Sequence, residues 1–218
     1  MSWLENRYKN KLEAWCKFEP KLQLADIILV HTKGSFIGWS IRKLTRSYWD
    51  HVALVFAIPN PKLQFYNYLV IEANRKGLEV HRIQEYLKNF RHYDIGVKRV
   101  PGMDLATRER VLAFMLNQVD QPYDLPRILG FVLRSFDLDV LKNFSNLFVD
   151  KNDFICSSFT QKAFYEAFPE NRKQDVVFRE GIFKRKKTKE AFVELLNYVS
   201  PGDIGKSDKA KWLYNERR

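Results

Sequence analysis

The sequence of 218 residues lacks most of the motifs that mark the common enzyme classes. No glycine-rich stretch ends in Gly-Lys-Ser/Thr, and Gly34 and Gly38 stand without such a continuation, so a phosphate-binding loop is excluded. HExxH and paired CxxC are absent, which leaves a zinc site without sequence support. Gly-x-Ser-x-Gly, the nucleophile elbow of serine hydrolases, is missing as well. We therefore expect neither a metal nor an organic cofactor.

Cysteine is scarce, and long apolar runs are missing. Cys16 and Cys156 are the two cysteines, and their different contexts indicate no disulfide framework. The opening stretch MSWLENRYKNKLEAW is charged throughout, unlike a secretory signal, and no run reaches the length of a membrane span. We expect a cytoplasmic protein. The length and the 45% hydrophobic content suffice for one core, so we expect a single domain over 1–218, decorated by an N-terminal helix at 1–20 and a basic segment at 184–190.

Positive charge is in excess. The formal net charge is +11, from 37 Lys and Arg against 26 Asp and Glu, and it favours contact with an anionic polymer or membrane surface. The densest run, KRKKTK at 184–189, is of a kind that usually forms a solvated face. Because no RNA-binding or zinc-finger signature accompanies it, no specific nucleic-acid partner is expected. The oligomeric state stays open.

Hydrophobic periodicity predicts strands in the first half and helices in the second. Short runs of β-forming residues predict strands at 26–31, 51–56, 68–73, 78–81 and 94–100. Helical spacing or capping residues predict helices at 2–20, 35–46, from 104 to before Pro122, 128–136, 157–168 and 190–196. After the last of these helices we expect a short strand and then a turn at 200–203, SPGD, and we leave 137–153 unassigned. This order predicts an α+β protein with one antiparallel sheet.

The stretch NDFICSSFTQKAFYEAF at 152–168 places Cys156 at the start of a helix. Ser157 and Ser158 are short polar residues of the kind that hydrogen-bond free amides in a first helical turn. A helix N-terminus favours thiolate over thiol, which makes sulfur a nucleophile. The alternative is an inert cysteine of the core, which is common among Phe and Ile.

Two further polar residues fit a thiol-based mechanism. His51, one of four histidines, opens a strand of apolar β-formers, and Glu72 is a lone carboxylate within the apolar strand YLVIEA. A histidine can take the thiol proton and later protonate the leaving group, while a third polar residue holds the imidazole. We expect both side chains on neighbouring antiparallel strands, on the face that meets the N-terminus of the cysteine helix. The alternatives are a structural histidine and a glutamate that faces water.

At these residues the chain resembles a known family. Six stretches carry the resemblance in the family's order: LADIILVH, DHVALVF, VIEANRKGLEV, QPYDLPRILGF, FICSSFTQKAFYEAF and VSPGDIGKS. They are similar to the circularly permuted branch of the NlpC-type papain-like cysteine hydrolases, which includes YiiX- and YaeF-like proteins and the lecithin retinol acyltransferase relatives. The histidine precedes the cysteine, as the permutation requires, and the match covers most of 22–207.

The resemblance implies roles for individual residues. Cys156 would be the nucleophile, His51 the base and Glu72 the orienting residue. The fold implied is the permuted papain-like, NlpC-like one, with an antiparallel sheet packed against helices and the nucleophile at a helix N-terminus. The activity implied is cleavage of an amide bond, in a cell-wall peptide or a small amino-acid conjugate, through a thioester acyl-enzyme.

The substrate side of the resemblance is less closely matched. Tyr123 would lie near the site, as a donor to the oxyanion, with Asp124 and Ser157 in the same vicinity. Two departures concern specificity: Ala25 stands where a glycine is usual, and Ser158 stands where an acidic residue often follows Cys-Ser.

Two alternatives remain open beside the amidase. One is a hydrolase or acyltransferase of the same fold that acts on acyl esters of lipids. The other is a non-catalytic protein that binds nucleic acid or anionic membrane. The segments expected around the cleft carry charged residues, which favours a short polar substrate. These residues are Asp50, Lys76, Asp124 and Arg127.

Overall fold

A computed structural model of the chain describes residues 3–74, 77–89, 91–117, 153–179 and 196–217. Several expectations lie outside these residues. They are the helix at 128–136, all but the last residue of the helix at 190–196, the basic run at 184–189, and the residues Lys76, Tyr123, Asp124 and Arg127.

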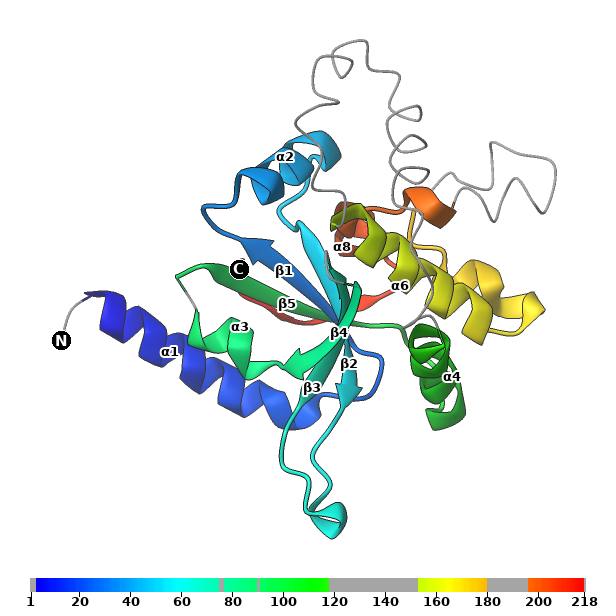
Figure 1. The fold of residues 1–218 in the computed structure, drawn as a ribbon, viewed down its shortest axis with the longest axis horizontal. Coiled ribbons are helices and arrows are strands. Elements are labelled where there is room, and N and C mark those ends of the chain that lie inside the picture. The colour runs from blue at the N-terminus through cyan, green and yellow to red at the C-terminus, as the bar shows by residue number, and fades with distance from the viewer. Residues whose placement is uncertain (1–2, 75–76, 90, 118–152, 180–195, 218) are drawn as a thin grey trace.

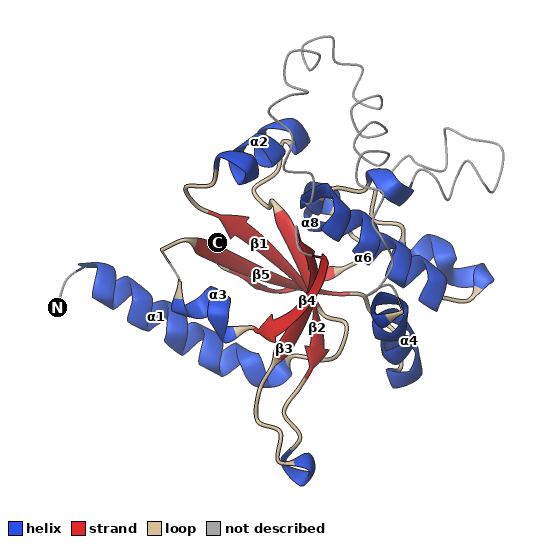
Figure 2. Cartoon of the chain, in the orientation of Figure 1, coloured by secondary structure: helices blue, strands red, loops and turns tan. Residues whose placement is uncertain are grey.

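The centre of the fold is a six-stranded sheet in the order β4-β3-β2-β1-β5-β6, in which every neighbouring pair is antiparallel (Figure 2). The strands are β1 (Ile27–Thr32), β2 (His51–Ala57), β3 (Leu69–Asn74), β4 (Gly77–Arg82), β5 (Tyr93–Arg99) and β6 (Lys211–Asn215). The five strands predicted from runs of β-forming residues are confirmed as β1 to β5, within a residue or two at each end.

Helices cover both faces of this sheet, and Figure 1 shows α1 and α3 on one side and α4, α6 and α8 on the other. The α-helices are α1 (Trp3–Phe18), α2 (Phe36–Thr45), α3 (Gln84–Lys88), α4 (Leu105–Leu116), α6 (Asp153–Ala167) and α8 (Pro201–Lys206). Short 3-10 helices lie at Glu19–Lys21, Pro61–Leu63, Glu170–Val176 and Leu196–Tyr198. The predicted α+β class is confirmed. No helix in the described ranges is both long and apolar enough to cross a membrane.

Strand β1 separates two hydrophobic cores, because successive strand residues point to opposite faces. Ile27 and Leu29 belong to the core that includes α4, α6 and α8, whereas Ile28 and Val30 belong to the core that includes α1 and α3. Burial on both faces explains why this strand is continuously apolar rather than alternating. Trp15 of α1 is almost fully buried in the second core, so the N-terminal helix is packed into the sheet.

Four elements differ from the sequence prediction. The short strand expected before 200 is not formed, because Leu196–Tyr198 is a 3-10 helix. Helix α3 and strand β6 were not predicted, since each is five residues long and too short for a period to show. The segment taken as a turn at 200–203 instead begins α8, whose Ser200 and Asp203 form a reciprocal capping box. Ser, Pro, Gly and Asp are common both in turns and at helix N-termini. Only the capping geometry shows that they begin a helix here.

Candidate active site

Cys156 lies in the first turn of α6, which begins at Asp153 rather than at Ser157. Its side chain is 1% exposed, and α6 packs on β2 and β3 through residues such as Phe159 and Phe164. The field of the helix N-terminus favours negative charge on a group in this turn. The prediction that the cysteine stands at the start of a helix is confirmed.

Ser157 and Ser158 do not cap this helix, contrary to our expectation. The Ser157 hydroxyl donates to the Val199 carbonyl at 2.7 Å, and the Ser158 hydroxyl donates to the Asn197 carbonyl at 2.5 Å. Because α6 starts earlier, both serines lie beyond its first residues and face the segment that leads into α8. They therefore tie the cysteine helix to the segment before α8.

His51 and Glu72 form a hydrogen-bonded pair across two neighbouring antiparallel strands, as predicted. Nε2 of His51 lies 2.8 Å from Oε2 of Glu72, and both side chains are largely buried. Cys156 contacts the same imidazole and acts on it through a hydrogen bond and through charge. Since Nε2 is engaged by the carboxylate, Nδ1 is the ring nitrogen that can exchange a proton with the thiol.

Both side chains lie on one face of the sheet, and Cys156 in the first turn of α6 reaches them there, as predicted. His51 is in register with Val30, and Glu72 lies two residues after Val70, so both side chains share the face of the core beside α1 and α3. The body of helix α6, through residues such as Phe159 and Phe164, packs on the opposite face, which the sequence did not predict. Cys156 therefore meets the imidazole where β2 begins, at an end of the sheet. The alternation of side chains along a strand fixes which residues share a face. It does not tell where a distant helix packs, so the sequence could not predict this arrangement.

The charges of the three groups support one another. Burial alone lowers the pKa of His51, but the charges of Cys156 and Glu72 and the hydrogen bonds to both raise it well above its ordinary value. Burial raises the pKa of Glu72, but the charge of His51 and hydrogen bonds from His51, His81 and Tyr86 together hold it far below its usual range. Within this pair, the imidazolium form of His51 beside the carboxylate form of Glu72 is thus favoured.

Tyr86 and His81 complete the surroundings of Glu72, and sequence reasoning assigned neither a role. The Tyr86 hydroxyl, from α3, donates to Oε2 of Glu72, and Nε2 of His81, from β4, lies 3.4 Å from Oε1. Burial lowers the pKa of His81, but the hydrogen bond and charge of Glu72 outweigh it and raise the pKa. A histidine on the strand that follows YLVIEA was visible in the sequence, but its register against β3 was not.

Comparison with known families identifies the chain. The family described as permuted papain-like amidase enzyme, YaeF/YiiX, C92 family, matches residues 21–214. The chain belongs to this family. It is a cysteine hydrolase of the permuted papain-like fold, as the resemblance implied.

One solved structure is similar over most of both chains. It is described as the crystal structure of metalloprotein yiiX from Escherichia coli O157:H7, and it shares 17% identity at a TM-score of 0.53. The similarity covers 89% of this chain and 97% of that chain, and at such low identity it shows the fold alone. No curated protein matches the chain significantly.

The yiiX description raises the question of a metal in this family member. Within the described parts of the chain, no group of three or more His, Cys, Asp or Glu side chains is placed to hold a metal ion. The nearest set, His51 and His81 about Glu72, is arranged as a hydrogen-bonded cluster with Tyr86. These residues do not fit a metal centre, and no step below involves one.

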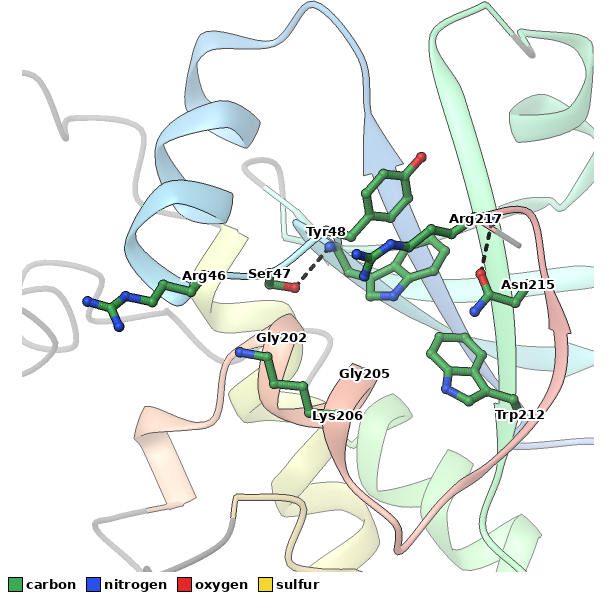
Figure 3. Close-up of a pocket in the computed structure, with 10 residues that line it drawn as sticks. Arg46, Ser47, Tyr48, Gly202, Gly205, Lys206, Trp212, Asn215 and Arg217 are labelled. Atoms are coloured by element: carbon green, nitrogen blue, oxygen red, sulfur yellow. Dashed lines mark hydrogen bonds between the residues drawn. The ribbon is translucent and has the colours of Figure 1, made fainter.

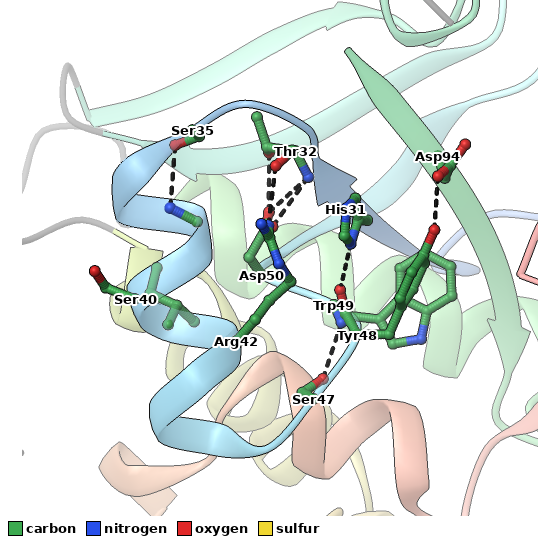
Figure 4. A network of polar contacts seen from close by, with 12 residues as sticks. His31, Thr32, Ser35, Ser40, Arg42, Ser47, Tyr48, Trp49, Asp50 and Asp94 are labelled. Carbon is green, nitrogen blue, oxygen red and sulfur yellow. Dashed lines mark hydrogen bonds and ion pairs between the residues drawn. The ribbon is translucent and has the colours of Figure 1, made fainter. Parts of the chain in front are cut away.

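Asp50, which precedes His51, does not line a substrate cleft as we expected. Its carboxylate is buried, accepts hydrogen bonds from the Thr32 amide and hydroxyl, and forms an ion pair with Arg42 (Figure 4). A Cβ on Gly38 would lie 2.9 Å from Oδ2 of Asp50, so the helix approaches this pair closely. A carboxylate with this set of partners has a structural role, because it anchors the loop that leads into His51.

Proposed function

We propose that the enzyme hydrolyses amide bonds of short peptides or small amino-acid conjugates, cell-wall peptides among them, through a thioester on Cys156. The observation that carries this proposal is the imidazole of His51, which pairs with Glu72 through Nε2 and also contacts Cys156. A thiol, an imidazole and an orienting carboxylate in this order are what nucleophilic acyl transfer requires.

The reaction has two halves. His51 holds the thiol proton, and the Cys156 sulfur attacks the amide carbonyl carbon to give a tetrahedral oxyanion. His51 then donates that proton to the leaving amine, the C–N bond breaks, and a thioester remains. In the second half, water attacks the thioester while His51 takes its proton. The C–S bond breaks, the carboxylic acid leaves, and the thiol is restored by the proton on His51.

Glu72 serves both halves without bonding to substrate. Its hydrogen bond to Nε2 holds the ring in one tautomer and orientation, and its charge stabilises the imidazolium. The oxyanion develops beside the N-terminus of α6, where the helix field favours negative charge. We propose that Tyr123 borders this oxyanion and that Asp124 lies beside it; both are outside the described residues.

The choice of an amide substrate is supported by the family, which is described as one of amidases. Asp50 was one of the charged residues expected to contact a short polar substrate. Its carboxylate instead pairs with Arg42 and accepts a hydrogen bond from Thr32, so it is not offered to a substrate. Lipid acyl esters and acyl transfer to another nucleophile would use the same sulfur and imidazole. The substrate panel below is designed to separate these outcomes.

The test is to trap the acyl-enzyme. The protein is incubated with amino-acyl amides, short cell-wall peptides and phospholipids, quenched in acid, and the peptide that contains Cys156 is examined by mass spectrometry. We expect an amino-acyl or peptidyl adduct, and none on the Cys156→Ala variant. A long-chain fatty acyl adduct would overturn the amide proposal but keep the nucleophile. If no panel member acylates Cys156 while nucleic acid binds with a steep salt dependence, the binding-protein alternative prevails.

A further inference from the structure

A second candidate binding site lies apart from the proposed active site. A cavity of about 300 Å³ opens between the loop joining α2 to β2, helix α8 and strand β6 (Figure 3). None of Cys156, His51 and Glu72 is among the described residues that line it. Its volume is at the lower end of the range for small-molecule pockets, so it suits a small ligand rather than a polymer.

Two indole rings form an apolar wall of this cavity. The rings of Trp49 and Trp212 both line the cavity, with centroids 5.7 Å apart, and glycines leave room for them. Figure 3 shows Trp212 on the β6 side. A Cβ on Gly205 would lie 2.8 Å from Trp49, and one on Gly96 would lie 2.7 Å from Trp212. A side chain at either glycine would push an indole ring aside. Trp49 is almost fully buried.

Three cations surround the same cavity. Arg46, Lys206 and Arg217 line it, and no Asp or Glu is among its described lining residues. None of the three forms an ion pair with any carboxylate in the described ranges. Among the described residues, Nζ of Lys206 donates one hydrogen bond, to the Thr45 carbonyl at 3.2 Å. The Arg217 guanidinium lies over the ring of Tyr48, 5.2 Å from its centroid, and has no described carboxylate within ion-pair distance.

The neutral polar groups of the lining also present donors. The Ser47 hydroxyl oxygen accepts from the Trp49 amide at 2.9 Å, and Oδ1 of Asn215 accepts from the Arg217 amide at 3.0 Å. With those oxygens engaged, the hydroxyl proton of Ser47 and the amide protons of Asn215 remain for a ligand.

The carbonyl oxygens at the C-terminal end of α8 already accept hydrogen bonds from a lysine. The buried ammonium of Lys98 donates to the carbonyls of Ile204, Gly205 and Ser207, at 2.9, 3.1 and 2.6 Å. These carbonyls would otherwise present the negative end of the helix beside the cavity. The cavity therefore presents cations and N–H or O–H donors against an aromatic wall.

We propose that this cavity binds a small organic anion. Lys206 and Arg217 hold its phosphate or carboxylate group, and its flat apolar part lies against Trp49 and Trp212. Charge-assisted hydrogen bonds from Arg and Lys are the strong ones for such oxyanions. Five donors without a competing carboxylate exclude a cationic ligand, and the indoles favour an anion that carries a ring over inorganic phosphate.

The test uses the indole N–H signals of the full-length protein in ¹⁵N-edited NMR. Phenyl phosphate, benzoate, inorganic phosphate and uncharged benzyl alcohol are titrated separately. We expect saturable shifts of the Trp49 and Trp212 signals, assigned by Trp→Phe variants, with phenyl phosphate or benzoate, and weaker binding as salt rises. The double variant Lys206→Gln/Arg217→Gln should bind at least about tenfold more weakly. The matched control Lys209→Gln, an exposed lysine that does not line the cavity, should bind as the wild type does.

Comparison of the titrated ligands identifies the chemical group that the cavity binds. Preference for phenyl phosphate or for benzoate identifies the phosphate or the carboxylate as the anionic group. Equal binding of benzyl alcohol, absence of any shift at both indoles, or undiminished affinity of the double variant would overturn the proposal. Because no lining residue belongs to the proposed active site, Cys156→Ala should bind these probes like the wild type. Failure of the hydrolase proposal and failure of this one are thus distinguishable.

Discussion

Oε2 of Glu72 lies 2.8 Å from Nε2 of His51, although the two residues are 21 positions apart in the chain. The antiparallel pairing of β2 with β3 brings them together. This contact fixes the imidazole so that its other nitrogen is available to Cys156, and it places a carboxylate where an imidazolium forms. Most of the tests below perturb this pair or one of the groups that hold it.

Cys156 should react with iodoacetamide faster than Cys16 near neutral pH, although Cys16 is exposed and Cys156 is buried. A thiolate is the reacting species, and an adjacent imidazolium favours it. The His51→Ala change should slow alkylation of Cys156 by about tenfold or more and leave Cys16 unchanged. Peptide mass spectrometry over time measures both rates in one sample. Equal rates for the two cysteines, or no effect of His51→Ala, would contradict the proposed catalytic role.

Glu72→Gln should lower kcat/KM by about 10²- to 10⁴-fold, because the amide keeps the shape but loses the charge that supports the imidazolium. The charge of Glu72 raises the pKa of His51, so its removal lowers that pKa. The high-pH limb of the pH profile, where the imidazolium is lost, should therefore move to lower pH. Steady-state rates across pH, with circular dichroism as a folding control, test this. An unshifted limb would argue against the assignment of Glu72.

Tyr86→Phe should destabilise the fold by about 1–3 kcal/mol, since a buried carboxylate loses a hydrogen-bond donor. It should also reduce kcat several-fold while KM changes little, because Tyr86 positions Glu72 and does not touch substrate. Tyr93→Phe is the matched control: Tyr93 packs against Tyr86, and its hydroxyl makes no hydrogen bond in the described structure. Equal effects of the two variants would show that the Tyr86 hydroxyl has no positioning role and that the residue contributes through packing.

The contribution of His81 to stability should depend on pH. The pKa of His81 is raised above its ordinary 6.5, so the stabilisation is fully present below that value and is lost as pH rises through the higher folded pKa. The pKa of Glu72 is lowered below its ordinary 4.5. The contribution of Glu72 to stability is therefore present above that value and is lost as pH falls through the folded pKa. Urea unfolding of wild type and His81→Gln should differ most between these two values, by about 1 kcal/mol. The exposed His92→Gln is the control, and a pH-independent difference would contradict the ion-pair account.

Lys98→Met should destabilise the protein by about 2 kcal/mol or more, because three carbonyls at the end of α8 lose their donor. Burial lowers the pKa of Lys98 to about 8, opposed by the charge of Asp208, so the ammonium is still mostly charged at neutral pH. Urea unfolding measures the loss against Lys209→Met, an exposed lysine in the same region. Equal stability of the two variants would show that the buried ammonium has no net role.

The three proposed catalytic residues were predictable because each carries a local signal. His51 opens an apolar strand, Glu72 interrupts one, and Cys156 begins a helix with apolar spacing. Tyr86 carries no comparable signal, since an aromatic residue in a short helix is usually a core residue. Asp50 carried a misleading signal: a charged residue beside the proposed catalytic histidine pointed to substrate, but its carboxylate pairs with Arg42 and accepts a hydrogen bond from Thr32.

The sequence by itself determined five of the six strands, the early position of the cysteine in its helix, and the family's order of histidine before cysteine. These follow from short-range periodicity and from residue types at fixed places in the chain. Only the tertiary structure decided that His51 and Glu72 point away from the face on which α6 packs, that His81 and Tyr86 hold Glu72, and that α1 joins the second core. Those relations depend on strand register and on contacts between distant segments, and a pattern within one segment contains no information about its partner's register.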